Sequence, residues 1–333
     1  MANAPLSQLG KAARLSVAPM MDWTDRHCRY LHRIMSRHTR LYTEMVSAPA
    51  LVRGGALHLL EFNTEEHPVA LQLGGSDPIE LAKAARLGQD AGYDEINLNV
   101  GCPSDRVQAG TFGAILMKTP ELVADCCAAM CEEVDIEVTV KCRIGVDNQL
   151  PQKVLPQFLS QVSASGISRF TVHARKAWLE GLSPKENRNI PPLDYDLVIQ
   201  MKALFPELNI SINGGITSLH QAQSFLECGL DGVMIGRAAY NQPSDILGLA
   251  DHLIFREAYN YDPAQIVHKM LPYIEAHMIR GGKLNQITRH MLGLFAAKPG
   301  ARAWRRVLSE RSHTCGPELV LEALSHVEQQ RAA

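Results

Sequence analysis

One cysteine of this 333-residue sequence lies where a thiol could do chemistry. Cys102 follows an apolar run and stands between Gly101 and Pro103, which restrict the turn that holds it. A thiol in such a turn can serve as a nucleophile or as a general acid. Cys126 and Cys127 instead fall in an amphipathic helical stretch, where a buried, inert thiol is expected. Cys102 is therefore the candidate catalytic cysteine.

Lysine, histidine and glutamine side chains mark the ends of three strand-like runs. Lys141 has polar neighbours on its own face, which favours a place in a pocket. There it could form a Schiff base with a carbonyl substrate, or it could place a positive charge near N1 of a flavin. His173 is either a pocket residue or a core histidine with satisfied hydrogen bonds. Gln72 either reads the edge of a flavin ring or pairs with backbone groups. These residues indicate a polar pocket and leave its chemistry open.

Two glycine turns at consecutive strand ends indicate an anion site. Asn213-Gly214-Gly215 follows one apolar run and Gly236-Arg237 follows the next. Glycine lets backbone N–H groups approach a phosphate, and an arginine fork can bind its oxygens. Barrel enzymes commonly bind phosphate between their last two strands. We therefore expect a phosphorylated substrate or the phosphate tail of FMN here, rather than two ordinary turns.

Short apolar runs alternate with helical stretches along most of the chain. Asp77-Pro78 and Thr119-Pro120 each carry a helix-start signal. Strands that alternate with helices predict a parallel sheet, and eight units in about 240 residues match a (β/α)₈ TIM barrel. A doubly wound sheet is the rival fold, but no run carries its GxGxxG turn. The predicted strands lie near residues 15–18, 40–43, 69–73, 95–99, 137–141, 169–173, 209–213 and 232–235.

Polar and apolar residues alternate within these runs, so the two faces of each strand differ. Asn97 and Asn99 share a face of the fourth run, and Thr139 and Lys141 share a face of the fifth. The apolar faces are expected to pack on the helices. The polar faces are expected to line the barrel and to meet at the carboxyl ends of the strands, where barrel enzymes place their chemistry.

The pattern changes near residue 243 from alternating runs to helices alone. We predict two domains, a barrel over residues 1–243 and a smaller all-helical domain over residues 244–333. Residues 256–311 contain ten Lys and Arg against four Asp and Glu, a local charge of +6. The rest of the chain therefore carries about −8. This asymmetry favours a partner that is a polyanion.

Composition and charge exclude several classes of protein. The net charge of −2 argues against indiscriminate coating of nucleic acid but allows a local basic face. No run is long enough to span a bilayer, and residues 1–14 lack the pattern of a signal peptide. Eight cysteines without a CxxC pair argue against a disulfide scaffold and a zinc or iron–sulfur site. We expect a cytoplasmic monomer without a bound metal.

Several motifs together resemble the tRNA-dihydrouridine synthase family over nearly the whole chain. Residues 18–25 (APMMDWTD) resemble its opening motif, and residues 97–103 (NLNVGCP) resemble its cysteine turn. The segments 177–188, 290–295 and 299–306 resemble its A subgroup, which modifies uridines 20 and 20a of tRNA. Further segments that follow in the family's order are 141–145 (KCRIG), 172–175 (VHAR) and 213–215 (NGG).

The resemblance implies a flavin-dependent reductase with FMN as its cofactor and NADPH as its electron donor. Reduced FMN would give hydride to C6 of a uracil drawn out of the tRNA D-loop, and Cys102 would protonate C5, which yields 5,6-dihydrouridine. Asn99 would contact the uracil. The implied FMN-binding residues are Pro19, Met20, Met21, Gln72, Lys141, His173, Asn213, Gly214, Gly215, Gly236 and Arg237.

The resemblance also implies tRNA as the macromolecular partner. Arg302, Arg305 and Arg306 share one helical face and would contact the tRNA backbone, although a solvated charged face is the simpler interpretation. Trp304 and Leu308 fall on another face and are expected in the core. In the loop after the sixth predicted strand, the implied tRNA contacts are Ser183, Lys185, Asn187 and Arg188.

Three other functions compete with reduction of tRNA. A barrel flavoenzyme that reduces a free pyrimidine would not need the basic helical part. An aldolase would form a Schiff base on Lys141 and would contain no flavin. A non-catalytic tRNA-binding or chaperone protein would leave Cys102 and the glycine turns without a purpose. Reduction of tRNA uridine uses all these features and is the favoured function.

Overall fold

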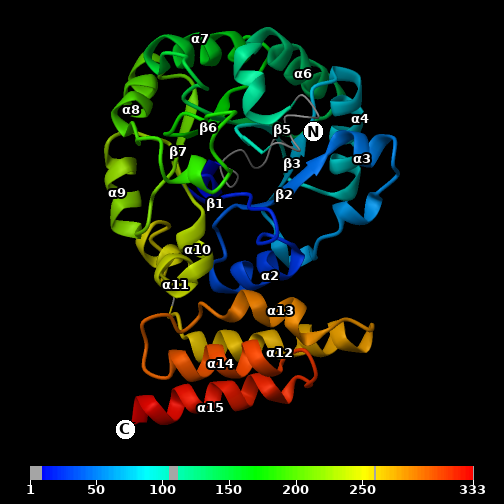
Figure 1. The fold of residues 1–333 in the computed structure, drawn as a ribbon, viewed down its shortest axis with the longest axis vertical. Helices are drawn as coiled ribbons and strands as arrows, with labels where there is room; N and C mark the ends of the chain where they lie inside the picture. Colours follow the sequence, from blue (N-terminus) through cyan, green and yellow to red (C-terminus); the bar gives the residue numbers. More distant parts are fainter. Residues whose placement is uncertain (1–9, 105–111, 259, 333) are drawn as a thin grey trace.

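A closed barrel of parallel strands forms the core of the protein. The computed structural model describes residues 10–104, 112–258 and 260–332, so most of the segment outside the family resemblance lies outside this description. Its sheet has the strand order β1-β8-β7-β6-β5-β4-β3-β2, and neighbouring strands pair in parallel. A bridge between Ser16 and Arg40 joins the two ends of this order. The predicted TIM barrel is therefore confirmed (Figure 1).

Helices cover the outside of this barrel and continue beyond it in sequence. The strands are β1 (Leu15–Val17), β2 (Leu41–Ser47), β3 (Val69–Gly74), β4 (Glu95–Val100), β5 (Glu137–Arg143), β6 (Arg169–His173), β7 (Asn209–Asn213) and β8 (Gly232–Ile235). The helices of the barrel region are α2 (Arg26–Met35), α3 (Ala48–Val52), α4 (Pro78–Ala91), α6 (Pro120–Glu133), α7 (Pro151–Ser163), α8 (Tyr195–Leu204), α9 (Leu219–Glu227), α10 (Arg237–Asn241) and α11 (Pro243–Leu253). Short 3₁₀ helices are η1 (Leu57–Leu60), η2 (Thr64–Glu66), η3 (Gly113–Lys118) and η4 (Glu186–Arg188).

The two helix-start signals differ in the structure. The Asp77 carboxylate accepts a hydrogen bond from the Glu80 N–H and caps α4. Thr119 precedes α6 but makes no side-chain cap hydrogen bond. Its backbone has φ −134° and ψ 65°, which is not the extended geometry that usually aims a capping hydroxyl at the first turn. Pro120 at the start of α6 still marks the boundary.

The apolar faces of the strands pack on the helices, as predicted. Leu71 of β3 and Ile96 of β4 are fully buried. A Cβ atom added at Gly88 of α4 would lie 2.6 Å from Leu71 Cδ2 and 2.7 Å from Ile96 Cδ1. The helix backbone therefore rests directly on these side chains. Burial of such apolar surface stabilises the barrel by about 25 cal/mol per Å².

Polar side chains fill the amino-terminal end of the barrel. Glu95 accepts hydrogen bonds from Tyr42 Oη (2.8 Å) and Thr139 Oγ1 (2.5 Å) and pairs with Arg40. Arg169 donates to Glu137 Oε1 at 2.8 Å. Each buried charge thus has a partner of opposite sign, which offsets the cost of removing it from water.

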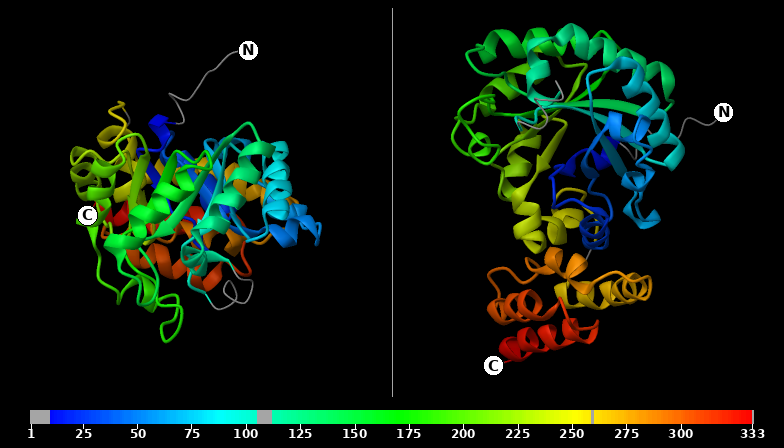
Figure 2. Two further views of the ribbon diagram at one scale, coloured as in Figure 1. Left: turned by 90° about the horizontal axis from the view of Figure 1, so that it is seen from above. Right: turned by 45° about the vertical axis from the view of Figure 1, so that its right-hand side comes forward.

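The carboxyl-terminal helices lie along one side of the barrel. They are α12 (Pro263–Ile279), α13 (Leu284–Met291), α14 (Ala301–Arg311) and α15 (Glu318–Ala332). Figures 1 and 2 show them as a layer beside α2, in orange to red. Trp304 and Leu308 are buried in this layer, as expected, and Trp304 Nε1–H donates to the Met291 carbonyl at 3.0 Å.

The first helix after the predicted domain boundary packs on the barrel. α11 begins at Pro243 and contacts α9 and α2. Its buried Asp251 accepts hydrogen bonds from Ser36 Oγ and the Arg37 N–H, both just after α2. The division of the chain at residue 243 stays a prediction. Among the described residues, no helix has the length and apolar character that crossing a membrane requires.

Candidate active site

The Cys102 turn is held by side-chain and backbone hydrogen bonds at the carboxyl end of β4. Asn99 Oδ1 accepts from the Gly101 N–H at 3.0 Å and from the Cys102 N–H at 2.9 Å. On the other side, the Ala114 N–H donates to the Cys102 carbonyl at 2.9 Å. Cys102 itself is partly exposed. The turn therefore holds an accessible thiol in a defined position.

A chain of amides and one hydroxyl crosses the barrel below this turn. Asn99 Nδ2 donates to Gln72 Oε1 at 2.8 Å, and Gln72 Nε2 donates to Asn97 Oδ1 at 2.8 Å. Asn97 Nδ2 then donates to Thr139 Oγ1 at 2.7 Å. The strand register sets these contacts, because Gln72, Asn97 and Thr139 are direct neighbours across β3, β4 and β5. The predicted inward polar face is confirmed for these residues.

Lys141 reaches across the mouth from β5 toward β7. Its Nζ donates to Asn213 Oδ1 at 3.1 Å, and Asn213 Nδ2 donates to the Met234 carbonyl at 2.8 Å. Burial and, after it, the charge of Arg143 together lower the pKa of Lys141 to about 8. The amine is thus close to its protonation midpoint at neutral to mildly alkaline pH.

His173 lies against the glycine turn at the end of β7. A Cβ atom at Gly214 would lie only 2.6 Å from His173 Cδ2, and Gly214 has φ +112°, so this position requires glycine. Burial lowers the pKa of His173 well below its ordinary value, and neighbouring Arg143 and Lys141 lower it further. The imidazole is therefore neutral, and it has room to face a ligand only because Gly214 lacks a side chain.

An excess of positive charge surrounds His173 and fits a bound anion. Arg175 Nε is buried and has no hydrogen-bond partner among the described residues. Burial lowers the pKa of Arg175 and of Arg188, and Arg237 lowers both further. Guanidinium groups that repel one another at close range are stabilised by an anion between them. Arg175, Arg188 and Arg237 together supply the positive charge, and Arg175 Nε supplies the free donor, that a phosphate requires.

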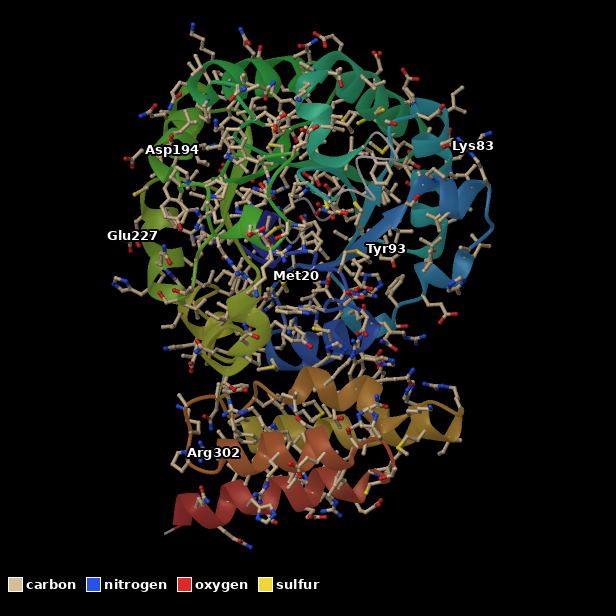
Figure 3. The ribbon with its side chains drawn as sticks, in the orientation of Figure 1. Met20, Lys83, Tyr93, Asp194, Glu227 and Arg302 are labelled. Atoms are coloured by element: carbon tan, nitrogen blue, oxygen red, sulfur yellow. The ribbon has the colours of Figure 1, made fainter. Side chains whose placement is uncertain are left out.

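The ends of β1 and β8 complete the mouth. A Cβ atom at Gly236 would lie 3.5 Å from Ala18 Cβ and 3.6 Å from Met20 Sδ, so the two strand ends are in contact. Pro19 and Met20 are partly buried and Met21 is 56% exposed. Figure 3 shows Met20 near the middle of the barrel. The eleven residues predicted to bind FMN thus come from the carboxyl ends of β1, β3, β5, β6, β7 and β8.

The residues predicted to contact tRNA fall into two places. Ser183, Lys185 and Arg188 are exposed in the loop between β6 and α8, where Ser183 Oγ donates to Glu186 Oε2 at 2.6 Å. Three further residues, Arg302, Arg305 and Arg306, belong to α14 in the helical layer, and all three are exposed. Figure 3 shows Arg302 at the left edge of that layer, well apart from Met20.

Asn187 differs from the other loop residues because it is fully buried. Its Oδ1 accepts from the Trp178 N–H at 2.7 Å, and its Nδ2 donates to the carbonyls of Trp178 (2.8 Å) and Leu182 (3.0 Å). The amide thus satisfies backbone groups inside the loop and has no surface to offer. No feature of the sequence distinguishes Asn187 from its exposed neighbours.

Sequence reasoning also assigned no role to Arg143. This side chain is 3% exposed and donates from Nε to the Gly101 carbonyl at 2.8 Å. Its place could have been found from the parity of the strand, because residue 143 shares a face with Lys141. The site therefore contains a buried cation directly beside the Cys102 turn.

Fold and site together define a class of barrel enzyme whose strands bring cationic side chains, a lysine and a partly exposed cysteine together at their carboxyl ends. The family model described as dihydrouridine synthase (Dus) matches residues 16–330. The chain belongs to the dihydrouridine synthase family, and it is therefore a flavin-dependent oxidoreductase. This membership sets aside the aldolase and the non-catalytic alternatives.

Curated relatives match along nearly their whole lengths. A protein of Shewanella oneidensis is 57% identical over 318 residues, which are 93% of this chain and 92% of the relative. A protein of Vibrio parahaemolyticus is 56% identical and covers 95% of this chain and 97% of its own length. A protein of Escherichia coli is 57% identical over 93% of this chain and 90% of its own length. Each of the three is named tRNA-dihydrouridine(20/20a) synthase.

A solved structure also resembles this fold. The old yellow enzyme homologue of Zymomonas mobilis aligns with a TM-score of 0.53 over 75% of this chain and 90% of its own, at 13% sequence identity. At this identity the likeness concerns the fold, and it supports the barrel architecture described above.

Proposed function

We propose that this protein reduces uridines 20 and 20a in the D-loop of tRNA to 5,6-dihydrouridine, with FMN as its bound flavin and NADPH as the electron donor. One observation carries the proposal: a partly exposed cysteine, a lysine and a cluster of cationic side chains share a single barrel mouth. The three curated relatives named above, which carry this activity in their names, support the choice of tRNA and of these positions.

The residues of the mouth fit FMN in two groups. Arg175 and Arg237, together with the turns at Gly214 and Gly236, suit the phosphate, because they combine positive charge with close backbone approach. Gln72, Lys141 and residues 19–21 suit the ring. When bound, FMN supplies a hydride to C6 of the uracil. Lys141 places positive charge where the ring gains electrons.

Cys102 then completes the reduction. Its S–H bond breaks, the proton forms a new bond at C5 of the uracil, and a thiolate remains. Lys141 and Arg143 are close enough for their charges to interact with the thiolate, and both stabilise it. The target base must leave its stack to reach the thiol. We propose that Asn99 mainly orients Cys102, since its oxygen is engaged there and only one amide hydrogen remains beyond the bond to Gln72.

The tRNA contacts that we propose involve the two exposed basic regions. The first region is the loop beside the mouth, which carries Ser183, Lys185 and Arg188. The second is α14, which carries Arg302 and Arg305. We propose that Asn187 shapes this loop instead of contacting RNA, because its amide is buried. The cytoplasmic location and the monomeric state stay predictions.

A redox cycle followed by absorbance tests the proposal. The purified protein is expected to show a flavin spectrum that bleaches with NADPH under anaerobic conditions and recovers when tRNA lacking dihydrouridine is added. The Cys102→Ala variant is expected to bleach but to recover slowly, by about a hundredfold or more, because it lacks the proton donor. A colourless protein that takes up no FMN, or recovery with free uridine as fast as with tRNA, would contradict the proposal.

A further inference from the structure

Arg143 links two loops at the mouth of the barrel. It ends β5, and its guanidinium donates from Nε to the Gly101 carbonyl at 2.8 Å. From Nη1 it donates to the carbonyls of Lys176 at 3.0 Å and Asn187 at 3.2 Å. Gly101 belongs to the cysteine turn, whereas Lys176 and Asn187 belong to the loop between β6 and α8. One side chain therefore ties these two segments together.

The charge on Arg143 is compensated in an unusual way. The pKa of Arg143 is lowered to about 10: burial is the largest cause, a Cys102 thiolate acts in the opposite direction, and the charges of Arg188 and Arg175 add to the effect of burial. Among the described residues, no carboxylate forms an ion pair with Arg143. Within the part of the chain that the structure describes, the hydrogen-bond partners of this buried cation are backbone carbonyls, whose dipoles stabilise it. A lysine could not replace it, because only the planar fork reaches carbonyls in different directions.

The contact with Gly101 bears directly on the thiol. The Gly101 carbonyl and the Cys102 N–H belong to the same peptide unit. Arg143 binds the carbonyl on one side of that unit, and Asn99 Oδ1 accepts from the N–H on the other. With the peptide plane held at both ends, the direction in which the Cys102 side chain leaves the backbone is set.

We propose that Arg143 is a positioning residue that orients the Cys102 thiol for proton transfer and couples this turn to the loop carrying Lys185 and Arg188. The identity of the substrate in this inference rests on the proposed function, whereas the geometry of the thiol is independent of that function. Contact between tRNA and the loop would then shift the carbonyls of Lys176 and Asn187. Through Arg143, this shift would change the position of the Cys102 thiol.

The experiment compares Arg143→Lys with Arg169→Lys in the flavin-loaded enzyme. Arg169 is a matched control, because it is also a buried strand arginine but lies at the opposite end of the barrel, where it pairs with Glu137 and Asn209. Three quantities are measured: reduction of the bound flavin by NADPH, its reoxidation by tRNA in a single turnover, and alkylation of Cys102 by iodoacetamide. Alkylation of the exposed Cys228 in the same sample is the internal reference.

For Arg143→Lys we expect an unchanged flavin content and an unchanged rate of NADPH reduction. Reoxidation by tRNA should slow by about ten- to a hundredfold, because even a small misplacement of a reacting group lowers the rate by such a factor. The alkylation rate of Cys102 should change relative to that of Cys228. Arg169→Lys should leave reoxidation and alkylation as in the parent enzyme. In Arg143→Ala, added methylguanidinium should restore part of the reoxidation rate.

Each other outcome overturns a defined part of the scheme. If Arg143→Lys leaves Cys102 alkylation and reoxidation unchanged, the positioning role is wrong. If it lowers flavin content and NADPH reduction as much as reoxidation, or if Arg169→Lys has the same effects, Arg143 only stabilises the fold. If alkylation of Cys102 responds to Arg143→Lys while the parent enzyme shows no reoxidation by tRNA, the proposed function fails and the geometric role stands.

Discussion

At the scale of single residues, Lys141 is the group of the mouth whose charge changes nearest to neutral pH. Burial, followed by the charge of Arg143, lowers its pKa to about 8. A lysine with a lowered pKa carries its charge below that value and loses it above. The hydrogen bond to Asn213 Oδ1 keeps Nζ in place in either state, because both forms of the amine donate. The charge of the site, but not its shape, should therefore depend on pH.

This charge gives a pH prediction for the flavin-loaded enzyme. Reduction of the flavin by NADPH should slow as the pH rises through about 8 or somewhat above it, because Lys141 loses the charge that stabilises an electron-rich ring. A bound anion raises the pKa of a neighbouring amine, so the midpoint should not lie below that value. Stopped-flow absorbance measures the rate. The flavin-loaded Lys141→Gln variant should lack this inflection; the same inflection in that variant would assign it to another group.

At the scale of elements, the turn after β7 joins backbone conformation to the ligand site. Gly214 combines φ +112° with a near contact to His173, whereas Gly229, in the turn before β8, has φ +92° and no atom within 4 Å of an added Cβ. Both positions disfavour a side chain through the backbone. Only Gly214 also disfavours it through a neighbour.

We predict that Gly229→Ala lowers the free energy of unfolding by about 1–2 kcal/mol, the cost of a left-handed backbone, and that Gly214→Ala lowers it by more, because the new methyl group also meets His173. Only Gly214→Ala should also lower flavin affinity, since its new methyl group displaces the imidazole of His173. Chemical denaturation measures the first effect and flavin fluorescence titration the second. A normal flavin affinity in Gly214→Ala would show that His173 does not contribute to the site.

At the scale of the whole molecule, the helical layer is tied to the barrel beside its mouth. Asp25, which caps α2, accepts from Arg289 Nη2 at 2.5 Å and lies 3.0 Å from His290 Nε2, both on α13. Burial raises the pKa of Asp25, but the hydrogen bond and charge of His290 outweigh it, so the pKa falls below its usual range. The carboxylate thus joins the two parts as a charged group.

The arginines of α14 test whether that surface binds RNA. Replacing Arg302, Arg305 and Arg306 by Gln should weaken tRNA binding and reduce the slope of log Kd against log salt by about 0.7 to 0.9 for each phosphate that these side chains neutralise. Flavin content should not change. Arg311→Gln is the matched control, because Arg311 is on the same helix but pairs with Glu322. Equal slopes in the triple variant and the parent would place the RNA elsewhere.

Much of this protein follows from local periodicity and residue type. Alternation with period two placed Asn97, Asn99 and Lys141 on the inner faces of strands, and the strand–helix repeat predicted the barrel. The arginine face of α14 and the buried Trp304 likewise followed from the helical period. These features depend on neighbours in the chain, so they could be predicted from the sequence alone, as could the family from its motifs.

Which atoms meet depends on the three-dimensional fold. Asn99 and Gln72 are 27 residues apart, and Arg143 and Gly101 are 42 apart, yet each pair forms a hydrogen bond. These hydrogen bonds depend on strand register and on closure of the barrel, which involve all eight strands at once. Likewise, Asn187 is buried because its loop folds around it, not because of its neighbours in sequence. A pattern along one chain specifies the face of a residue, whereas its partner across the barrel is set by the closed sheet.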